Sequence, residues 1–255
     1  MKVLMVRLRY VFLAAAVAFA AVAAVFAVRG AEAADVYWNG AGRSLPIYSV
    51  ERTDKKIAIT FDCAWGTDHT DAILSALEAG GVRATFFMTQ FWVETNPDHV
   101  KKIDAAGHEI GTHSATHSHM SAQSEEEIRA ELSSSSRAIE AVTGKDVSLF
   151  RPPFGDYDDL LIDTSNDMGL YPVQWDVDSL DWKELSAQDI VSRIVGRVKA
   201  GSIILCHNDG KHTAEALPAV LDTLKARGYE FVPVGELIYR DGYTIDPSGR
   251  QVKNA

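Results

Sequence analysis

The feature that most constrains the fold is a regular alternation of short apolar or β-branched runs with amphipathic helical stretches. The expected strands are 57–62, 84–88, 108–112, 147–151, 170–175, 202–207 and 230–234, and the expected helices are 70–79, 97–106, 124–142, 158–168, 186–199 and 213–227. Strands joined by helices pair in parallel, because parallel neighbours need crossover connections. The pattern predicts an α/β fold, and it fits a barrel and an open doubly wound sheet equally well.

Glycines follow most of the expected helices, where a left-handed C-cap favours them. They are Gly80, Gly107, Gly144, Gly169, Gly201 and Gly228. No long Gly/Ser linker interrupts the pattern, so we expect one domain over 54–239. The segment 34–53 is then a lead-in, and 240–255 is a polar tail with a turn at 246–249 and no expected chemistry.

The N-terminus resembles an export signal. Basic residues precede an uncharged apolar run at 10–28, Arg29 closes the run, and a small-x-small cleavage pattern follows at 31–33. The run is also near the roughly 20 residues that span a bilayer. We therefore expect 1–33 to be a signal peptide or an N-terminal membrane anchor. The domain is then extracytoplasmic, either secreted or anchored to the outer face of the membrane.

The charge balance limits the partners. The chain has 25 Lys and Arg against 35 Asp and Glu, a formal net charge of −10, and no basic runs. This argues against nucleic acid as a partner and against contact with an anionic membrane other than through the N-terminal segment.

The chain contains two cysteines, which excludes a disulfide-rich scaffold and a cysteine-built zinc finger. Cys63 and Cys206 belong to the first and sixth expected strands, and we expect the seventh strand to lie between them in a closed barrel. Two strand spacings are about 9.5 Å, beyond the roughly 7 Å Cα limit for a disulfide. We therefore expect no disulfide.

Polar side chains recur at the carboxyl ends of five expected strands. Asp62, Arg151 and His207 end strands, His113 follows one, and Asp176 and Asp178 follow another. In barrels and in open parallel sheets alike, this edge carries the chemistry. The pattern predicts a catalytic or binding site there.

Two histidines follow the third strand. His113 and His117 are spaced i, i+4, so a helical turn would direct both at one divalent metal ion. The alternative is a solvated turn that also contains His119. Asp62 ends the first strand, either as a general base beside a metal-bound water or as a helix cap.

Two further segments suggest catalysis. Arg151 precedes two prolines, which fix the backbone so that the N–H of Phe154 can act as an oxyanion donor. Alternatively, Arg151 only pairs with surface carboxylates. In the sixth strand, alternation places Leu205 and His207 on one face and Cys206 on the other.

The ordered set of motifs resembles the NodB-homology polysaccharide deacetylases, carbohydrate esterase family four, over residues 50–240. The blocks Ala64-Trp65-Gly66, RPPFGDYD from Arg151 and WDVDSLDW from Trp175 are most similar to the PdaB-type sporulation deacetylases. The resemblance implies a distorted (β/α)7 barrel. It also implies removal of N-acetyl groups from a peptidoglycan-type or chitin-like aminosugar polymer of the spore or cell wall, usually with a divalent metal such as Zn²⁺.

The resemblance also implies residue roles. Asp62 matches the catalytic base, Arg151 the residue that orients it, His207 the general acid and Asp181 the carboxylate that tunes the acid. His113 and His117 match metal ligands. The residues expected to bind substrate are Phe154, at the oxyanion position, the aromatic Trp182 and Tyr157, and Leu205 of the acetyl pocket.

One position departs from the family pattern, because Cys63 replaces the second of two adjacent aspartates, a metal ligand. Either a Cys63 thiolate or Asp68 is then the candidate third protein ligand, and water is the remaining choice. The departure also motivates a second hypothesis, a catalytically inactive protein that binds wall glycan. A Ser or Cys hydrolase is a poorer hypothesis, because no nucleophile-elbow motif surrounds Cys63.

Overall fold

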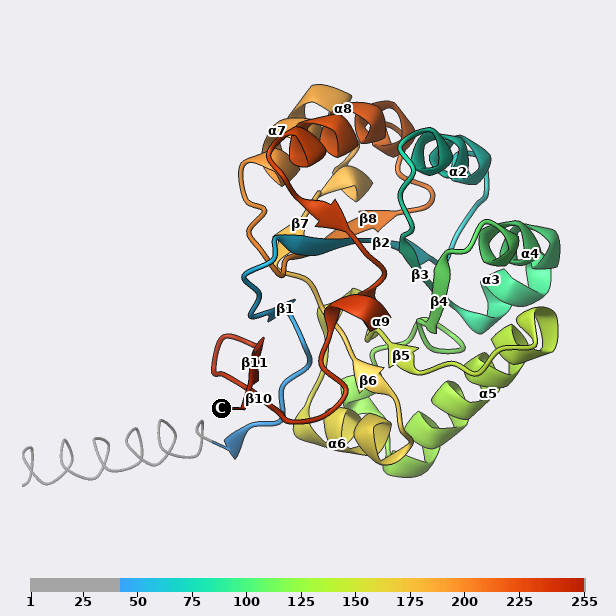
Figure 1. The fold of residues 1–255 in the computed structure, drawn as a ribbon. Coiled ribbons are helices and arrows are strands. Elements are labelled where there is room, and N and C mark those ends of the chain that lie inside the picture. The colour runs from blue at the N-terminus through green and yellow to red at the C-terminus, as the bar shows by residue number, and fades with distance from the viewer. Residues whose placement is uncertain (1–41, 255) are drawn as a thin grey trace, which may run out of the picture. The chain divides into compact units, whose positions relative to one another are not determined.

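A computed structural model describes residues 42–254, and the signal or anchor expected at 1–33 lies outside them (Figure 1). Residues 44–254 form one compact unit. At its centre is an eight-stranded sheet with the order β6-β5-β4-β3-β2-β8-β7, and β9 pairs separately with β2. All of these pairs are parallel, which confirms the expected α/β fold.

The strands become shorter away from the centre of the sheet. They are β2 (Lys56–Cys63), β3 (Thr85–Met88), β4 (Glu109–Thr112), β5 (Leu149–Phe150), β6 (Tyr171–Pro172), β7 (Val177–Asp178), β8 (Ile203–His207) and β9 (Glu230–Phe231). The sheet curls, with helices around its outer side (Figure 1). Its two end strands, β6 and β7, do not pair with each other, so the barrel is not closed there. The result is the distorted (β/α)7 barrel that the family resemblance predicts.

The expected place of the last strand is wrong. β9 pairs only with Lys56 and Ile57, at the start of β2, whereas β8 pairs directly with β2 from Ala58 to Asp62. β9 is too short to separate the two strands. Cys206 is the register partner of Phe61. Cys63 lies two residues further along β2, so the two cysteines are not opposite each other. Both cysteines are free and buried, and the register of β2 and β8 separates them, not an intervening strand.

Helices cover the outside of the sheet. They are α2 (Thr70–Ala79), α3 (Gln90–Thr95), α4 (Pro97–Ala105), α5 (Glu125–Thr143), α6 (Asp159–Asp167), α7 (Ala187–Val195) and α8 (Thr213–Ala226). A capping box of Ser124 and Glu127 begins α5, and left-handed Gly144 ends it. Of the six expected left-handed glycines, only Gly80 is wrong, because it stays right-handed and Gly81 takes the positive φ.

Alternation along β2 divides the core into two layers. Ile57, Ile59, Phe61 and Cys63 pack in the outer cluster beneath the helices. Ala58 belongs to the inner cluster, which also contains Phe87 and Val234 of α9 (Val234–Leu237). A Cβ on Gly111 would lie 2.8 Å from the Phe87 ring, so this glycine makes room for the inner packing. Asp62, two residues beyond Thr60, therefore points into the barrel.

The lead-in and the tail pack together. β1 (Ser49–Val50), β11 (Arg250–Lys253) and β10 (Tyr243–Ile245) form a three-stranded sheet in that order. The turn expected at 246–249 closes the β10–β11 hairpin, with Gly249 N donating to Asp246 O over 2.8 Å. The compact unit thus extends beyond 54–239 at both ends. Within residues 42–254, no helix has the length and apolarity needed to cross a membrane.

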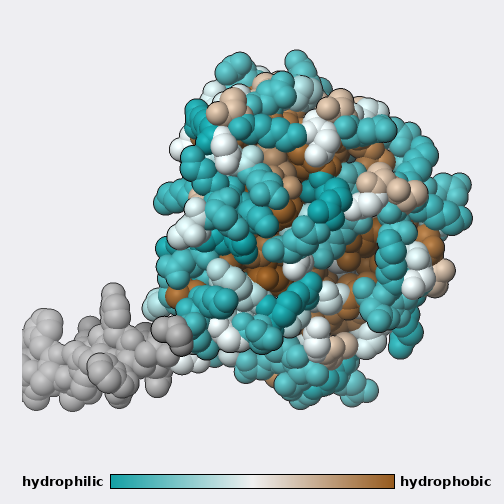
Figure 2. Space-filling view, in the orientation of Figure 1, coloured by the Kyte–Doolittle hydropathy of each residue, from teal (hydrophilic) through white to brown (hydrophobic). Residues whose placement is uncertain are grey.

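The surface is mainly hydrophilic on the face drawn in Figure 2, and apolar residues appear there in hollows between polar ones. Four large hydrophobic residues of the described chain are more exposed than this pattern suggests: Trp65, Phe154, Leu160 and Trp182. Three of the four are aromatic and follow the carboxyl ends of strands.

Candidate active site

The expected acid and base meet at the carboxyl edge of the sheet. Asp62 in β2 and His207 in β8 are register partners in neighbouring parallel strands. Adjacent strands lie about 4.8 Å apart, and register partners project to the same side. The two side chains therefore reach one small volume, as the resemblance predicts.

Arg151 organises the base. Its Nη1 donates to Asp62 Oδ1 over 2.7 Å and to Thr60 Oγ1 over 2.8 Å, and Nη2 donates to Gln174 O over 3.1 Å. The guanidinium lies 4.1 Å from the centre of the Phe87 ring. Arg151 is fully buried, so it is no surface ion pair. Burial raises the pKa of Asp62, but the charge of Arg151 and its hydrogen bond to the carboxylate outweigh this and hold that pKa below its usual value.

Asp181 organises the acid. His207 Nδ1 donates to Asp181 Oδ1 over 2.7 Å, and the His207 N–H donates to Asp181 Oδ2 over 2.8 Å. Thr213, which sequence reasoning missed, donates its hydroxyl to the same Oδ2 over 2.7 Å. Burial lowers the pKa of His207, but the hydrogen bond and charge of Asp181 prevail and raise that pKa to about 9. His207 is therefore protonated at neutral pH.

The histidine pair is brought together by a loop and not by a helix. His113 follows β4, and positive φ angles at Ser114 (72°) and His117 (56°) bend the chain back. The imidazole centres are 4.9 Å apart. His113 Nδ1 donates to Arg151 O over 2.8 Å, so Nε2 of the neutral ring is unprotonated and is the atom that could bind a metal; it lies 3.5 Å from Asp62 Oδ2. Burial lowers the pKa of both rings, that of His117 to about 4, so both are neutral.

Neither candidate third ligand forms a group with this pair in the described chain, and a ligand role for either stays a prediction. Cys63 packs in the outer apolar cluster, on the opposite face of β2 from Asp62, and burial raises the pKa of its thiol well above the usual value. Asp68 is exposed. Over residues 42–254, no three His, Cys, Asp or Glu side chains form a group that could hold a metal ion. Two imidazoles alone do not complete the three-ligand protein set of a catalytic zinc site.

The expected substrate-binding residues occupy different depths. Phe154 has a φ of 61°, and its N–H has no protein acceptor within the described chain. Leu205 is buried two residues before His207 on the same face of β8. Trp182 is exposed directly after Asp181. Tyr157 contacts Tyr48 of the lead-in, with the two hydroxyls 3.2 Å apart. The roles of these residues stay predictions.

Two positions border the site without a role assigned to them by the family resemblance, although the sequence offered Trp65 as one of several aromatic residues that could stack on a sugar. The exposed Trp65 ring lies 4.6 Å from the His117 ring and 6.4 Å from the Phe91 ring, centre to centre. Its loop is held by Asn208, whose Nδ2 donates to the carbonyls of Trp65 (3.2 Å) and Gly66 (2.9 Å). Asn208 follows the His207 strand directly, and a polar residue at that edge is the signal that could have identified it.

The fold and the site together define the class: a parallel α/β barrel whose carboxyl edge holds an aspartate and a histidine, each paired with an oppositely charged side chain. A family model described as polysaccharide deacetylase matches residues 49–173. A peptidoglycan-N-acetylglucosamine deacetylase from Bacillus cereus is 36% identical over 196 residues, which cover 75% of this chain and 92% of that protein. The chain belongs to the polysaccharide deacetylase family.

Two other similarities matter for function. The chain is 34% identical to the peptidoglycan-N-acetylglucosamine deacetylase PgdA of Listeria monocytogenes over 73% of its own length, but it spans only 39% of that protein. It also superimposes, with a TM-score of 0.74 and 34% identity, on a CE4 family pseudoenzyme from Bacillus anthracis, covering 77% of this chain and 70% of that one. A mutant of that pseudoenzyme has restored enzymatic activity.

Proposed function

We propose that the chain hydrolyses N-acetyl groups on an aminosugar polymer of the cell wall. The observation that supports this most is the placement of an ionised Asp62 opposite a protonated His207 in one ladder. A base must be ionised and an acid protonated at the same pH, which requires environments that separate their pKa values. Arg151 and Asp181 provide those two environments.

The reaction follows from these groups. Asp62 removes a proton from a water molecule while the oxygen of that water adds to the acetyl carbonyl carbon. The tetrahedral oxygen accepts a hydrogen bond from Phe154 N–H, which is free to donate. His207 then gives its proton to the sugar nitrogen, the C–N bond breaks, and acetic acid and a free amine leave. Acetic acid loses its proton to the amine, Asp62 releases its proton to solvent, and His207 regains one, so both side chains return to their starting states. We derive no step through a metal, because the chain's own donors do not complete a site.

The substrate and the location belong to the same proposal. Peptidoglycan is the substrate printed in the names of the Bacillus cereus and Listeria relatives, which supports a peptidoglycan-type polymer. The expected export signal supports a location outside the cytoplasmic membrane, where such a polymer lies. A role in sporulation, suggested by the PdaB-type resemblance, completes the proposal.

A second candidate function is glycan binding without turnover. The orientation of Cys63 favours it, because the position that would complete the metal site faces the apolar layer. The similarity to a pseudoenzyme supports the same reading.

The test is acetate release from N-acetylated wall fragments. We expect the wild-type chain to release acetate, and Asp62→Asn and His207→Ala each to reduce the rate about 10²–10⁴-fold, the usual contribution of acid–base catalysis. Asp98→Asn, an exposed change on α4, is the control and should have no effect. Wild-type release that survives both changes would exclude this mechanism. Saturable fragment binding without release would establish the second candidate.

A further inference from the structure

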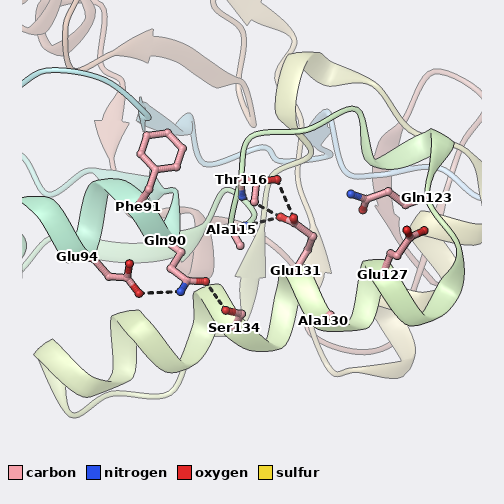
Figure 3. A pocket seen from close by; sticks show the side chains of 10 residues that line it. All are labelled: Gln90, Phe91, Glu94, Ala115, Thr116, Gln123, Glu127, Ala130, Glu131 and Ser134. Carbon is pink, nitrogen blue, oxygen red and sulfur yellow. Dashed lines mark hydrogen bonds between the residues drawn. The ribbon is translucent and has the colours of Figure 1, made fainter.

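A groove of about 690 Å³ lies beside the histidine loop (Figure 3). Gln90, Phe91 and Glu94 of α3 line one side, and residues of α5, among them Ala130 and Glu131, line the other. Ala115 and Thr116 of the loop between His113 and His117 complete the lining. The groove and the catalytic site therefore share this loop as a wall.

The groove is built and held in place by its own hydrogen bonds. Glu131 accepts from the N–H groups of Ala115 (2.8 Å) and Thr116 (2.9 Å) and from the Thr116 hydroxyl (2.7 Å). Gln90 donates to Glu94 over 2.7 Å and accepts from Ser134 (Figure 3). These bonds fix α3, the loop and α5 relative to one another. The groove is thus a preformed feature, as ligand sites generally are.

The lining suits a sugar. Phe91 contributes an aromatic ring, and the carboxamide and carboxylate side chains offer acceptors to hydroxyl and amide N–H groups. Gln123 Oε1, in the same lining, is buried and has no donor in the described chain. No Lys or Arg lines the groove, whereas Glu94, Glu127 and Glu131 do. A neutral or amine-bearing occupant is therefore favoured over an anionic one.

Aromatic rings connect the groove with the catalytic centre. Phe91 contacts Trp65, and Trp65 contacts His117, with ring centres 6.4 Å and 4.6 Å apart. The Trp65 ring is 56% exposed, so it can offer surface to a ligand. Resting on the proposed deacetylase function, we infer that this groove is a second sugar subsite. It binds an aminosugar of the same glycan chain beyond the one that reacts at Asp62 and His207.

Filling the groove tests the inference without removing any contact. Ala130 is exposed on α5 within the lining, and Ala130→Trp adds bulk there. The matched control is Ala226→Trp, at the exposed end of α8 and outside the lining. Acetate release is measured with oligomers of two and five N-acetylglucosamine units. We expect Ala130→Trp to lower the pentamer-to-dimer ratio of kcat/KM about tenfold, mainly through the KM of the pentamer, and Ala226→Trp to leave it unchanged.

Pentamer binding, measured by calorimetry on the same variants, separates this inference from the proposed function. If no variant, wild type included, releases acetate, the proposed function fails, and a tenfold weaker binding by Ala130→Trp alone still supports the subsite. An unchanged ratio together with unchanged pentamer affinity would overturn the subsite, whatever the activity. Equal losses in both tryptophan variants would attribute the effect to folding and also overturn it.

Discussion

Two halves of the site differ in whether each polar side chain has a partner within the site. The acid–base half consists of Asp62, Arg151, Asp181 and His207, and each of its charges is paired over 2.7 Å. The imidazole half consists of His113, His117 and position 63. It contains two neutral rings held by a loop with positive φ angles, and its third member, Cys63, faces away.

The difference teaches where this chain depends on charge. The charges of Asp62, Arg151 and Asp181 in the acid–base half are buried, so their pairs must be complete or the buried charges become costly. The imidazole half carries no charge at neutral pH, so the chain tolerates an incomplete set there. The predictions below challenge this contrast, beginning with the largest expected effect.

Arg151→Met should destabilise the fold most. It leaves the buried carboxylate of Asp62 without its partner, and breaking a buried ion pair in this way costs about 3–5 kcal/mol. Denaturant unfolding at neutral pH measures the loss. The double change Arg151→Met with Asp62→Asn should regain much of it, because no buried charge then remains. An equal loss in the single and double variants would assign the effect to packing on Phe87 instead.

Asp181→Asn should move the alkaline limb of activity to lower pH. His207 must be protonated to act, and its pKa is about 9 because of Asp181, so acetate release should decline as pH rises through about 9. Without the carboxylate that pKa falls towards 6.5, the usual value. The pH–rate profile gives the position of the limb. A limb that stays in place would mean that another group provides the acid.

The same pKa predicts how stability depends on pH. The pKa of His207 is higher in the folded state than in the unfolded chain, so protonated His207 stabilises the fold fully below about pH 6.5. This contribution is lost as pH rises through about 9. Unfolding free energies measured from pH 6 to 10 should decline for the wild type and less steeply for Asp181→Asn. An equal slope in both would contradict the assignment.

Cys63→Asp should destabilise the chain by about 2 kcal/mol or more in the presence of a chelator, because it directs a carboxylate into the outer apolar cluster. Cys63→Ser is the matched smaller change. Thermal unfolding with chelator and with Zn²⁺ gives the comparison. Full rescue by one zinc ion per chain would show that the end of β2 can turn this side chain towards the histidines, and the contrast between the halves would then disappear.

The smallest effect should come from Cys63→Ala. Because the thiol faces the helices, zinc binding by this variant, measured by calorimetry, should equal that of the wild type. His117→Ala is the positive control and should weaken any zinc binding that occurs. Reduced affinity in Cys63→Ala would mean that the thiol does reach the metal.

The positions of Asp62 and His207 could be predicted from the sequence because strand alternation fixes them, whereas Asp181 came only from the family resemblance. Asp62 and His207 end long apolar runs, and their direction follows from the period of two. The imidazole half was harder, because loop torsions at Ser114 and His117 decide where the rings point, and no periodicity encodes those. The i, i+4 spacing predicted the proximity of His113 and His117 but gave the wrong local structure.

The order of the strands shows a second limit. Seven β units suggest a closed ring, but β9 pairs through only two residues of β2, and β8 takes the neighbouring place. A sequence pattern shows which residues are apolar, but it does not show how many of them pair with a neighbouring strand. The hairpin of β10 and β11 was not predicted, because its residues are mostly polar and show no apolar run. It pairs with the lead-in strand β1.

The shared ladder of β2 and β8 has a mechanical consequence. Loops around the site, including those that carry Trp65, Phe154 and Trp182, can shift without changing the gap between Asp62 and His207, because interstrand hydrogen bonds of the backbone set that gap. Sliding one strand by a single residue would turn one of the two groups to the outer face. The separation of the Asp62 and His207 backbones is thus a fixed dimension of the scaffold, and a substrate of the proposed reaction must fit it.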